Sequence, residues 1–192
     1  MARKSTRDMI IGVAAELFAT LGLRRTTMEI IAAAAGRGRR TIYMYFSNKS
    51  EIYEAVVENE INRIIKPLSD ILASGDSFGM VLLHYSEERI RLLGDLAYRN
   101  SLLIKDFAMG LSRVEKLRER LLKEEIKIIT PFFSRCAEEL DHSTGTAIED
   151  YVLTFLNMLR GNDRLLIEKE SSERISDLMK TTCHIFLRGV RP

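Results

Sequence analysis

Apolar residues in the first fifty positions recur at intervals of three and four, which places them on one face of a helix. This spacing predicts a helix over about 10–21, which Gly22 ends. A short, alanine-rich helix is predicted over 28–35, with Gly36 as its stop, and a third helix over about 39–46. The apolar stripe of the first helix consists of Ile10, Val13, Ala14, Leu17, Phe18 and Leu21.

Capping residues mark the starts of the second and fourth helices. Thr26 is followed by Glu29 in a capping-box pattern, so we expect the Thr26 hydroxyl to accept from the Glu29 amide. Ser47 or Asn48 is expected to cap the fourth helix, with Glu51 in its first turn. Each of these pairings predicts where a helix begins.

The rest of the chain also has helical spacing, and no segment alternates apolar and polar residues for long enough to predict a strand. The long fourth helix is expected to end or kink at Pro67. Further helices are predicted over about 78–97, 101–109, 112–139 with a kink at Pro131, 146–167 and 172–188. The predicted fold class is therefore all-α, with about nine helices.

Charge is distributed unevenly along the 192 residues. Residues 1–50 carry nine Lys and Arg against three acids, whereas the remaining 142 carry 20 against 24. A basic first segment joined to a mildly acidic body is typical of a polyanion-binding domain with a separate second domain.

Several classes of protein do not fit the composition. Cys136 and Cys183 stand 47 positions apart with no partner pattern, and the three histidines are scattered. No spacing typical of a metal site or of paired catalytic carboxylates occurs, so we expect no cofactor, no metal and no enzymatic activity. No apolar run reaches membrane-spanning length, so the sequence predicts a cytoplasmic protein with no membrane partner.

The third helix carries side chains that suit a DNA groove. Ile42 and Phe46 are four apart and are expected to point inward, which leaves Arg39 and Arg40 largely outward. Arginine can bind guanine with two hydrogen bonds, and threonine can touch a thymine methyl. Hydroxyls near helix starts and a lysine can hold phosphates. The candidate DNA-binding residues are Thr26, Thr27, Arg37, Arg39, Arg40, Thr41, Tyr43, Tyr45 and Lys49.

Residues of about 6–53 resemble the DNA-binding domain of the TetR family of transcriptional regulators. The matching positions are Ala14-Ala15, Leu17-Phe18, Gly22, Thr26-Thr27, Ile31-Ala32, Ala35-Gly36, Thr41-Ile42-Tyr43, Tyr45-Phe46 and Lys49. The resemblance implies a helix-turn-helix domain over 1–48 and a helical effector-binding and dimerisation domain over 49–192. It further implies a homodimer on a palindromic operator in double-stranded DNA, usually a repressor released by a small molecule.

The chain departs from the family between the second and third helices. The family usually has a small aliphatic residue at position 37, Ser or Thr at 38 and a small residue at 40, whereas this chain has Arg37, Gly38 and Arg40. The capping hydroxyl is therefore absent, which costs about a few tenths of a kcal/mol. We hypothesise that the operator is richer in G·C pairs where Arg39 and Arg40 reach, or that non-specific affinity is high.

For the second domain, the resemblance implies an effector cavity between helices that is coupled to the DNA-binding domain through the fourth helix. Adaptable methionines and aromatic rings favour an apolar or aromatic effector. The candidate ligand-binding residues are Met80, Tyr85, Phe107, Met109, Phe133, Tyr151 and Phe155. The last two helices are expected to form the dimer interface through Ile148, Val152, Phe155, Leu159, Ile175, Leu178, Met179, Thr182 and Phe186.

Two other functions stay open at this point. An architectural or chromosome-organising DNA-binding protein would need no effector, and a helical protein–protein adaptor would need no DNA. The basic first segment argues against the adaptor. An apolar body of this size exceeds what DNA binding needs, which favours the regulator over the architectural protein.

Overall fold

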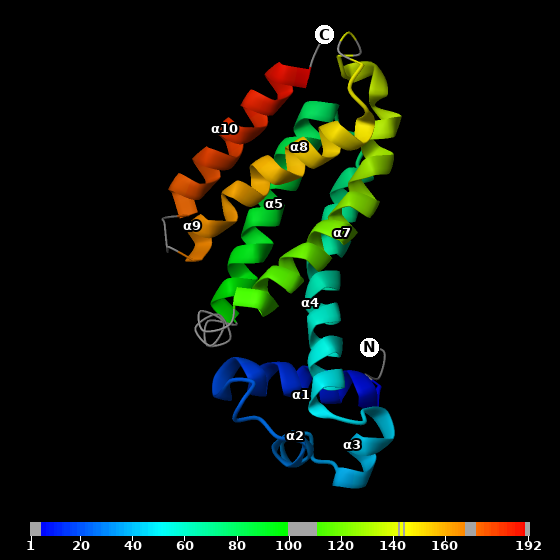
Figure 1. Cartoon of the computed structure of the whole chain (residues 1–192), viewed down its shortest axis with the longest axis vertical. Helices are drawn as coiled ribbons and strands as arrows, with labels where there is room; N and C mark the ends of the chain where they lie inside the picture. The colour runs from blue at the N-terminus through cyan, green and yellow to red at the C-terminus, as the bar shows by residue number, and fades with distance from the viewer. Residues whose placement is uncertain (1–4, 100–110, 142, 144, 168–171, 191–192) are drawn as a thin grey trace. The chain divides into compact units, whose positions relative to one another are not determined.

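The computed structural model describes residues 5–99, 111–141, 143, 145–167 and 172–190, and all regular elements in these ranges are helices. Figure 1 shows their order along the chain. The all-α prediction is confirmed, while the short helix predicted over 101–109 lies outside the described residues.

The chain divides into two compact units. The first comprises Met1–Asn62 and Tyr98–Leu117, and the second comprises Arg63–Ala97 and Arg118–Pro192. The boundary predicted at residue 48 lies at the start of the fourth helix, whereas the first unit extends to Asn62.

Three short helices and the beginning of a long one build the first unit. They are α1 (Thr6–Leu21), α2 (Met28–Ala34), α3 (Arg39–Tyr45) and the first turns of α4 (Lys49–Leu72). Gly22 ends α1 with a φ of 82°, and its amide donates to the Phe18 carbonyl oxygen. Asn48 Oδ1 accepts from the Glu51 amide at 3.0 Å, so Asn48 is one of the two caps predicted for α4.

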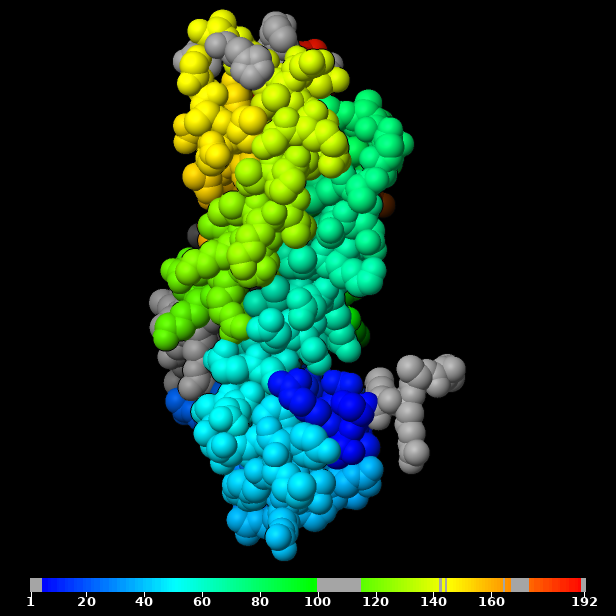
Figure 2. All heavy atoms as spheres, turned by 90° about the vertical axis from the view of Figure 1, so that its right-hand side faces the viewer, coloured from blue at the N-terminus to red at the C-terminus, as the bar shows by residue number. Residues whose placement is uncertain are grey.

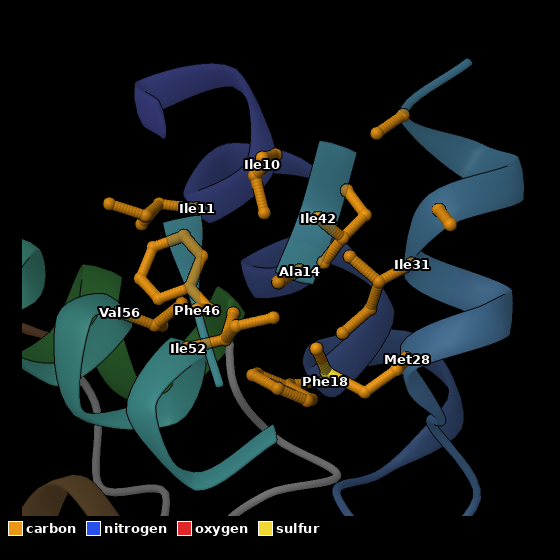
Figure 3. Packing of buried hydrophobic residues seen from close by; sticks show 12 residues of the cluster. Ile10, Ile11, Ala14, Phe18, Met28, Ile31, Ile42, Phe46, Ile52 and Val56 are labelled. Carbon is orange, nitrogen blue, oxygen red and sulfur yellow. The ribbon is translucent and has the colours of Figure 1, made fainter. Parts of the chain in front are cut away.

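A single hydrophobic cluster holds these helices together (Figure 3). Phe18 of α1, Ile31 of α2 and Ile42 of α3 are all fully buried in it. Phe46, directly after α3, points into the same cluster, as the spacing predicted. Because Ile42 and Phe46 fix one side of α3 against the core, the opposite side of that helix is turned outward.

The capping arrangement at the start of α2 differs from the prediction. Thr27 is the N-cap, and its hydroxyl oxygen accepts from the Ile30 amide at 3.3 Å. Thr26 is fully buried, and its hydroxyl donates to the Gly22 carbonyl oxygen at 2.9 Å. The prediction was therefore wrong by one residue, because core packing around the turn turns Thr26 inward and leaves Thr27 at the helix start.

Two glycines before α3 offer a matched stability test. Gly36 has a φ of 60° and Gly38 a φ of −65°, and a Cβ added to either meets no atom within 4 Å. We expect Gly36→Ala to lower the free energy of unfolding by about 1–2 kcal/mol, because an L side chain is disfavoured at positive φ. Gly38→Ser should raise it by about a few tenths of a kcal/mol by supplying the missing cap. Urea denaturation of the full chain measures both, and equal effects would contradict the backbone explanation.

The second unit contains the remaining helices, each longer than two turns except one. They are the end of α4, most of α5 (Phe78–Arg99), α7 (Leu111–Arg135) beyond its first turns, α8 (Ile148–Gly161), α9 (Asp163–Ile167) and α10 (Ser172–Val190), with a 3-10 turn at Ala137–Glu139. The helix predicted over 146–167 divides at Asn162, whose side-chain amide donates to the Met158 carbonyl oxygen.

Two prolines lie inside helices rather than at their ends. α4 continues past Pro67 to Leu72, and α7 continues past Pro131 to Arg135. A proline removes one backbone hydrogen bond from a helix. Leu68, Phe132 and other apolar residues beyond each proline are buried, so packing of the apolar face offsets that loss.

Candidate nucleic-acid interface

The outward side of α3 presents a dense set of large side chains. Met44 is 76% exposed, Tyr43 46% and Tyr45 44%, and Arg39 and Arg40 are exposed at the start of the same helix. Figure 2 shows this light-blue segment at the surface. Exposed apolar and aromatic groups gathered beside arginines indicate a binding surface, because water solvates them poorly.

The two α3 arginines differ in how they are held. Arg39 forms an ion pair with Glu29 at 2.7 Å, and its guanidinium lies 6.0 Å from the Tyr43 ring centroid. The pKa of Glu29 lies below its ordinary value, chiefly through its backbone hydrogen bond and the Thr27 hydroxyl, with Arg39 contributing. Arg40 makes no side-chain hydrogen bond or ion pair with the described part of the chain. Arg40 can therefore reach a ligand without breaking a polar contact to any described residue.

The structure separates the candidates for phosphate contact. Thr27 is exposed at the start of α2, but Thr26 is fully buried and cannot offer its hydroxyl to a phosphate, which corrects that prediction. The Lys49 ammonium donates to the carbonyl oxygens of Leu23 and Thr26, both at 2.7 Å. Lys49 therefore ties the start of α4 to the turn between α1 and α2, a role that the sequence did not indicate.

Further exposed side chains lie on α3 and in the turns beside it. Arg37 is exposed in the turn before α3, and Thr41 is half-buried. The prediction omitted Met44, although its position between two tyrosines and opposite Ile42 places it on the outward side. Exposed Arg24 and Arg25, in the turn next to Lys49, were also not assigned a role.

Comparison with known proteins agrees with this geometry. Residues 10–56, which include all of α2 and α3, match the family model described as bacterial regulatory proteins, tetR family. Over this DNA-binding segment the chain is similar to TetR-family regulators. TetR-family proteins are DNA-binding transcriptional regulators rather than enzymes.

One similar protein extends the match beyond the DNA-binding helices. The transcriptional regulator AcrR of Shigella flexneri is 29% identical over 72% of this chain and 70% of its own length. The transcriptional repressor KstR2 of Rhodococcus jostii is 32% identical, over 38% of this chain and 36% of its own length.

Solved structures share the fold at low sequence identity. A transcriptional regulator from Cytophaga hutchinsonii superposes with a TM-score of 0.72 at 23% identity, covering 96% of this chain and 98% of its own. SmeT, the repressor of a Stenotrophomonas maltophilia multidrug efflux pump, has a TM-score of 0.68 at 19% identity, and the match covers 98% of this chain and 92% of SmeT. Within the described ranges, none of the helices is both long and apolar enough to cross a membrane.

In the second unit, three of the described candidate ligand residues are fully buried packing residues. Tyr85, Phe133 and Phe155 are fully buried, with ring centroids of neighbouring pairs about 6.1 Å apart. Tyr151 donates its O–H to the Asp141 carbonyl oxygen, and Met80 is 46% exposed. Phe107 and Met109 lie outside the described residues. A ligand-binding role for these side chains stays a prediction.

Most of the stripe predicted for the dimer interface lies inside the protomer. Val152, Phe155 and Leu159 of α8 and Ile175, Met179 and Phe186 of α10 are buried, whereas Ile148, Leu178 and Thr182 are half-buried. The buried members pack within their own unit, while dimerisation through these two helices stays a prediction. The large apolar residues that these two helices expose are Leu153 and Ile185, at 39% and 60%.

A network of charged side chains lies buried in the second unit. Arg89 of α5, which is 1% exposed, donates through Nε to Glu125 of α7 at 2.6 Å and through a terminal nitrogen to Asp163 of α9 at 2.6 Å. Tyr85 donates its O–H to the same Glu125 at 3.0 Å. Sequence reasoning missed this network, although Arg89 lies one helical turn beyond Tyr85 in an otherwise apolar stripe.

Burial and charge act on the pKa values of this network. Burial by itself lowers the pKa of Arg89, but Glu125 and Asp163 more than offset it, so the pKa lies above its ordinary value. Burial, and then the charge of Glu125, raise the pKa of Tyr85 well above its ordinary value. Arg89 therefore stays charged and Tyr85 stays a hydrogen-bond donor across the physiological pH range.

Proposed function

We propose that the protein is a dimeric transcriptional repressor that binds a palindromic operator through α3 and leaves it when a small molecule binds the second unit. The observation that carries this proposal is the exposed side of α3, where two arginines and three large side chains stand opposite a buried anchor. Two such helices in a dimer would enter successive major grooves about 34–36 Å apart. Bacterial DNA lies in the cytoplasm, so the protein would act there.

The names of the relatives support the repressor role. KstR2 is named a transcriptional repressor, and SmeT is the repressor of a multidrug efflux pump. Release by an effector requires that the effector favour the conformation with low DNA affinity. A 100-fold release needs about 2.7 kcal/mol of coupling between the two sites.

We propose that the dimer forms through the outward sides of α8 and α10. Leu153 and Ile185 are the exposed apolar anchors there. We expect Ile185→Asp to weaken dimerisation at least about tenfold, because a charge would be buried without a partner. Sedimentation of the full chain measures the monomer–dimer equilibrium.

Met80→Asp is the matched control, since Met80 is an exposed apolar residue on a different helix of the same unit. This variant should dimerise as the parent protein does. If both variants weakened dimerisation equally, or if neither weakened it, the interface would lie elsewhere.

Selection of genomic DNA fragments on the purified protein tests the central proposal. The experiment is best done at about 150 mM salt, where purely electrostatic binding is weak. Recovery of a palindrome near a few promoters supports the repressor and provides the operator for effector screening. Broad recovery without a motif would instead favour an architectural protein, and no recovery would favour an adaptor.

A further inference from the structure

Burying the charged side chains around Arg89 carries a desolvation free energy that a role in stability alone does not explain. Its three charged side chains lie on α5, α7 and α9, and those of Arg89 and Glu125 are almost completely removed from water. A buried ion pair rarely stabilises a fold more than apolar side chains of the same shape would. A network of this kind, in the unit expected to bind an effector, therefore indicates a role in ligand binding.

The two carboxylates of the network are held differently. Glu125 is fully buried and accepts from both Arg89 and Tyr85, so it is locked from two sides. Asp163 contacts Arg89 through both of its oxygens, at 2.6 and 3.3 Å, but its side chain is 15% exposed. Arg118, whose side chain is 39% exposed, places a second guanidinium 3.9 Å from Asp163. Asp163 is thus a carboxylate between two arginines at the edge of the network.

We propose that Asp163 occupies the binding position of an anionic effector, so that the carboxylate of the effector replaces Asp163 on Arg89. The proposal deepens the proposed function and rests on it, because it names the chemical class of the small molecule. It also refines the predicted apolar or aromatic effector to one that carries a carboxylate.

Charge balance favours a carboxylate over other ligands. A carboxylate that takes the place of Asp163 leaves Arg89 paired as before, so no buried charge loses its partner. A cation could bind only by expelling the guanidinium of Arg89, which is 1% exposed and held by Glu125 as well. A neutral group would leave Arg89 with one carboxylate where it now has two.

The exchange would also reach the helices expected to form the dimer. Asp163 is the first residue of α9, and its contact with Arg89 connects α9 to α5. The side chain of Leu166 in α9 also packs beside Gly94 of α5. The preceding Asn162 donates to the Thr182 hydroxyl of α10 at 3.2 Å. Release of Asp163 would therefore loosen the junction of α8, α9 and α10.

The test compares the full-length parent protein with Asp163→Asn, which removes the internal competitor. Calorimetric titration without DNA uses octanoate, octanol and octylamine as probes of equal chain length, and acetate as a probe without a chain. We expect octanoate to bind Asp163→Asn at least about tenfold more tightly than the parent, because the competing conformation is lost. Octanol should change less than about twofold, and octylamine should bind more weakly. Asp177→Asn, at an exposed acid of α10, is the matched control and should leave all four affinities unchanged.

Other outcomes would overturn the assignment. An equal gain for octanoate and octanol would mean that the substitution only loosened the fold, and stronger binding of octylamine to the parent than to Asp163→Asn would mark a cation site. Absence of carboxylate binding to both proteins, acetate included, would also overturn it. Because no DNA is present, these results are independent of operator binding, which the genomic selection tests separately.

Discussion

Replacing Glu125 with glutamine is expected to lower the free energy of unfolding by about 3–5 kcal/mol, because Arg89 stays buried and charged, loses its fully buried partner and keeps only Asp163 at the edge of the network. Arg89 is 1% exposed and cannot regain water, and Tyr85 would keep only a neutral acceptor. Urea denaturation followed by circular dichroism measures the loss. Glu124→Gln is the matched control, since Glu124 precedes Glu125 on α7 and pairs with Lys127 at the surface. That variant should change stability by less than about 1 kcal/mol.

A combined variant separates loss of the pair from loss of packing. Arg89→Met, Glu125→Leu and Asp163→Asn together remove the buried charges while filling a similar volume. We expect the triple variant to be more stable than Glu125→Gln, because it leaves none of the three charges of the network buried. If the triple variant were less stable than the single one, the network itself would be the main source of stability, and the electrostatic explanation would fail.

Arg40→Ala is expected to reduce operator affinity by about 1–3 kcal/mol, which is roughly 5- to 150-fold. Arg40 is exposed on α3 and makes no polar side-chain contact with the described residues, so its full reach is available to a base edge. Arg39→Ala should reduce operator affinity less than Arg40→Ala does, because Arg39 must break its ion pair with Glu29 before it can bind DNA. Fluorescence anisotropy with the selected operator at fixed salt measures both.

Operator variants decide what Arg40 reads. If Arg40 binds guanine, replacing the G·C pair that it reaches should weaken the parent protein but leave Arg40→Ala unchanged. An equal loss on all sequences, with a smaller salt dependence, would make Arg40 a phosphate contact and would contradict base recognition.

The sequence by itself determined the helical character of both units and the construction of α3. The spacing of Ile42 and Phe46 was enough to show which side of α3 is buried, since helical periodicity is a local property. The stop at Gly22 and a cap at Ser47 or Asn48 were also predictable, because a cap involves residues only a few positions apart. The family resemblance depends on this same local segment.

Tertiary structure decided the features that depend on packing between distant residues. Periodicity gave α8 and α10 an apolar stripe, but only packing showed that most of this stripe is buried within the protomer. Thr26 and Thr27 have the same chemistry, and burial of the turn determined which one caps α2. Arg89, Glu125 and Asp163 are 36 and 38 positions apart along the chain, so no local pattern could join them. The cost of burying a charge is set by the surroundings that the fold creates, and for that reason the sequence alone did not reveal the network.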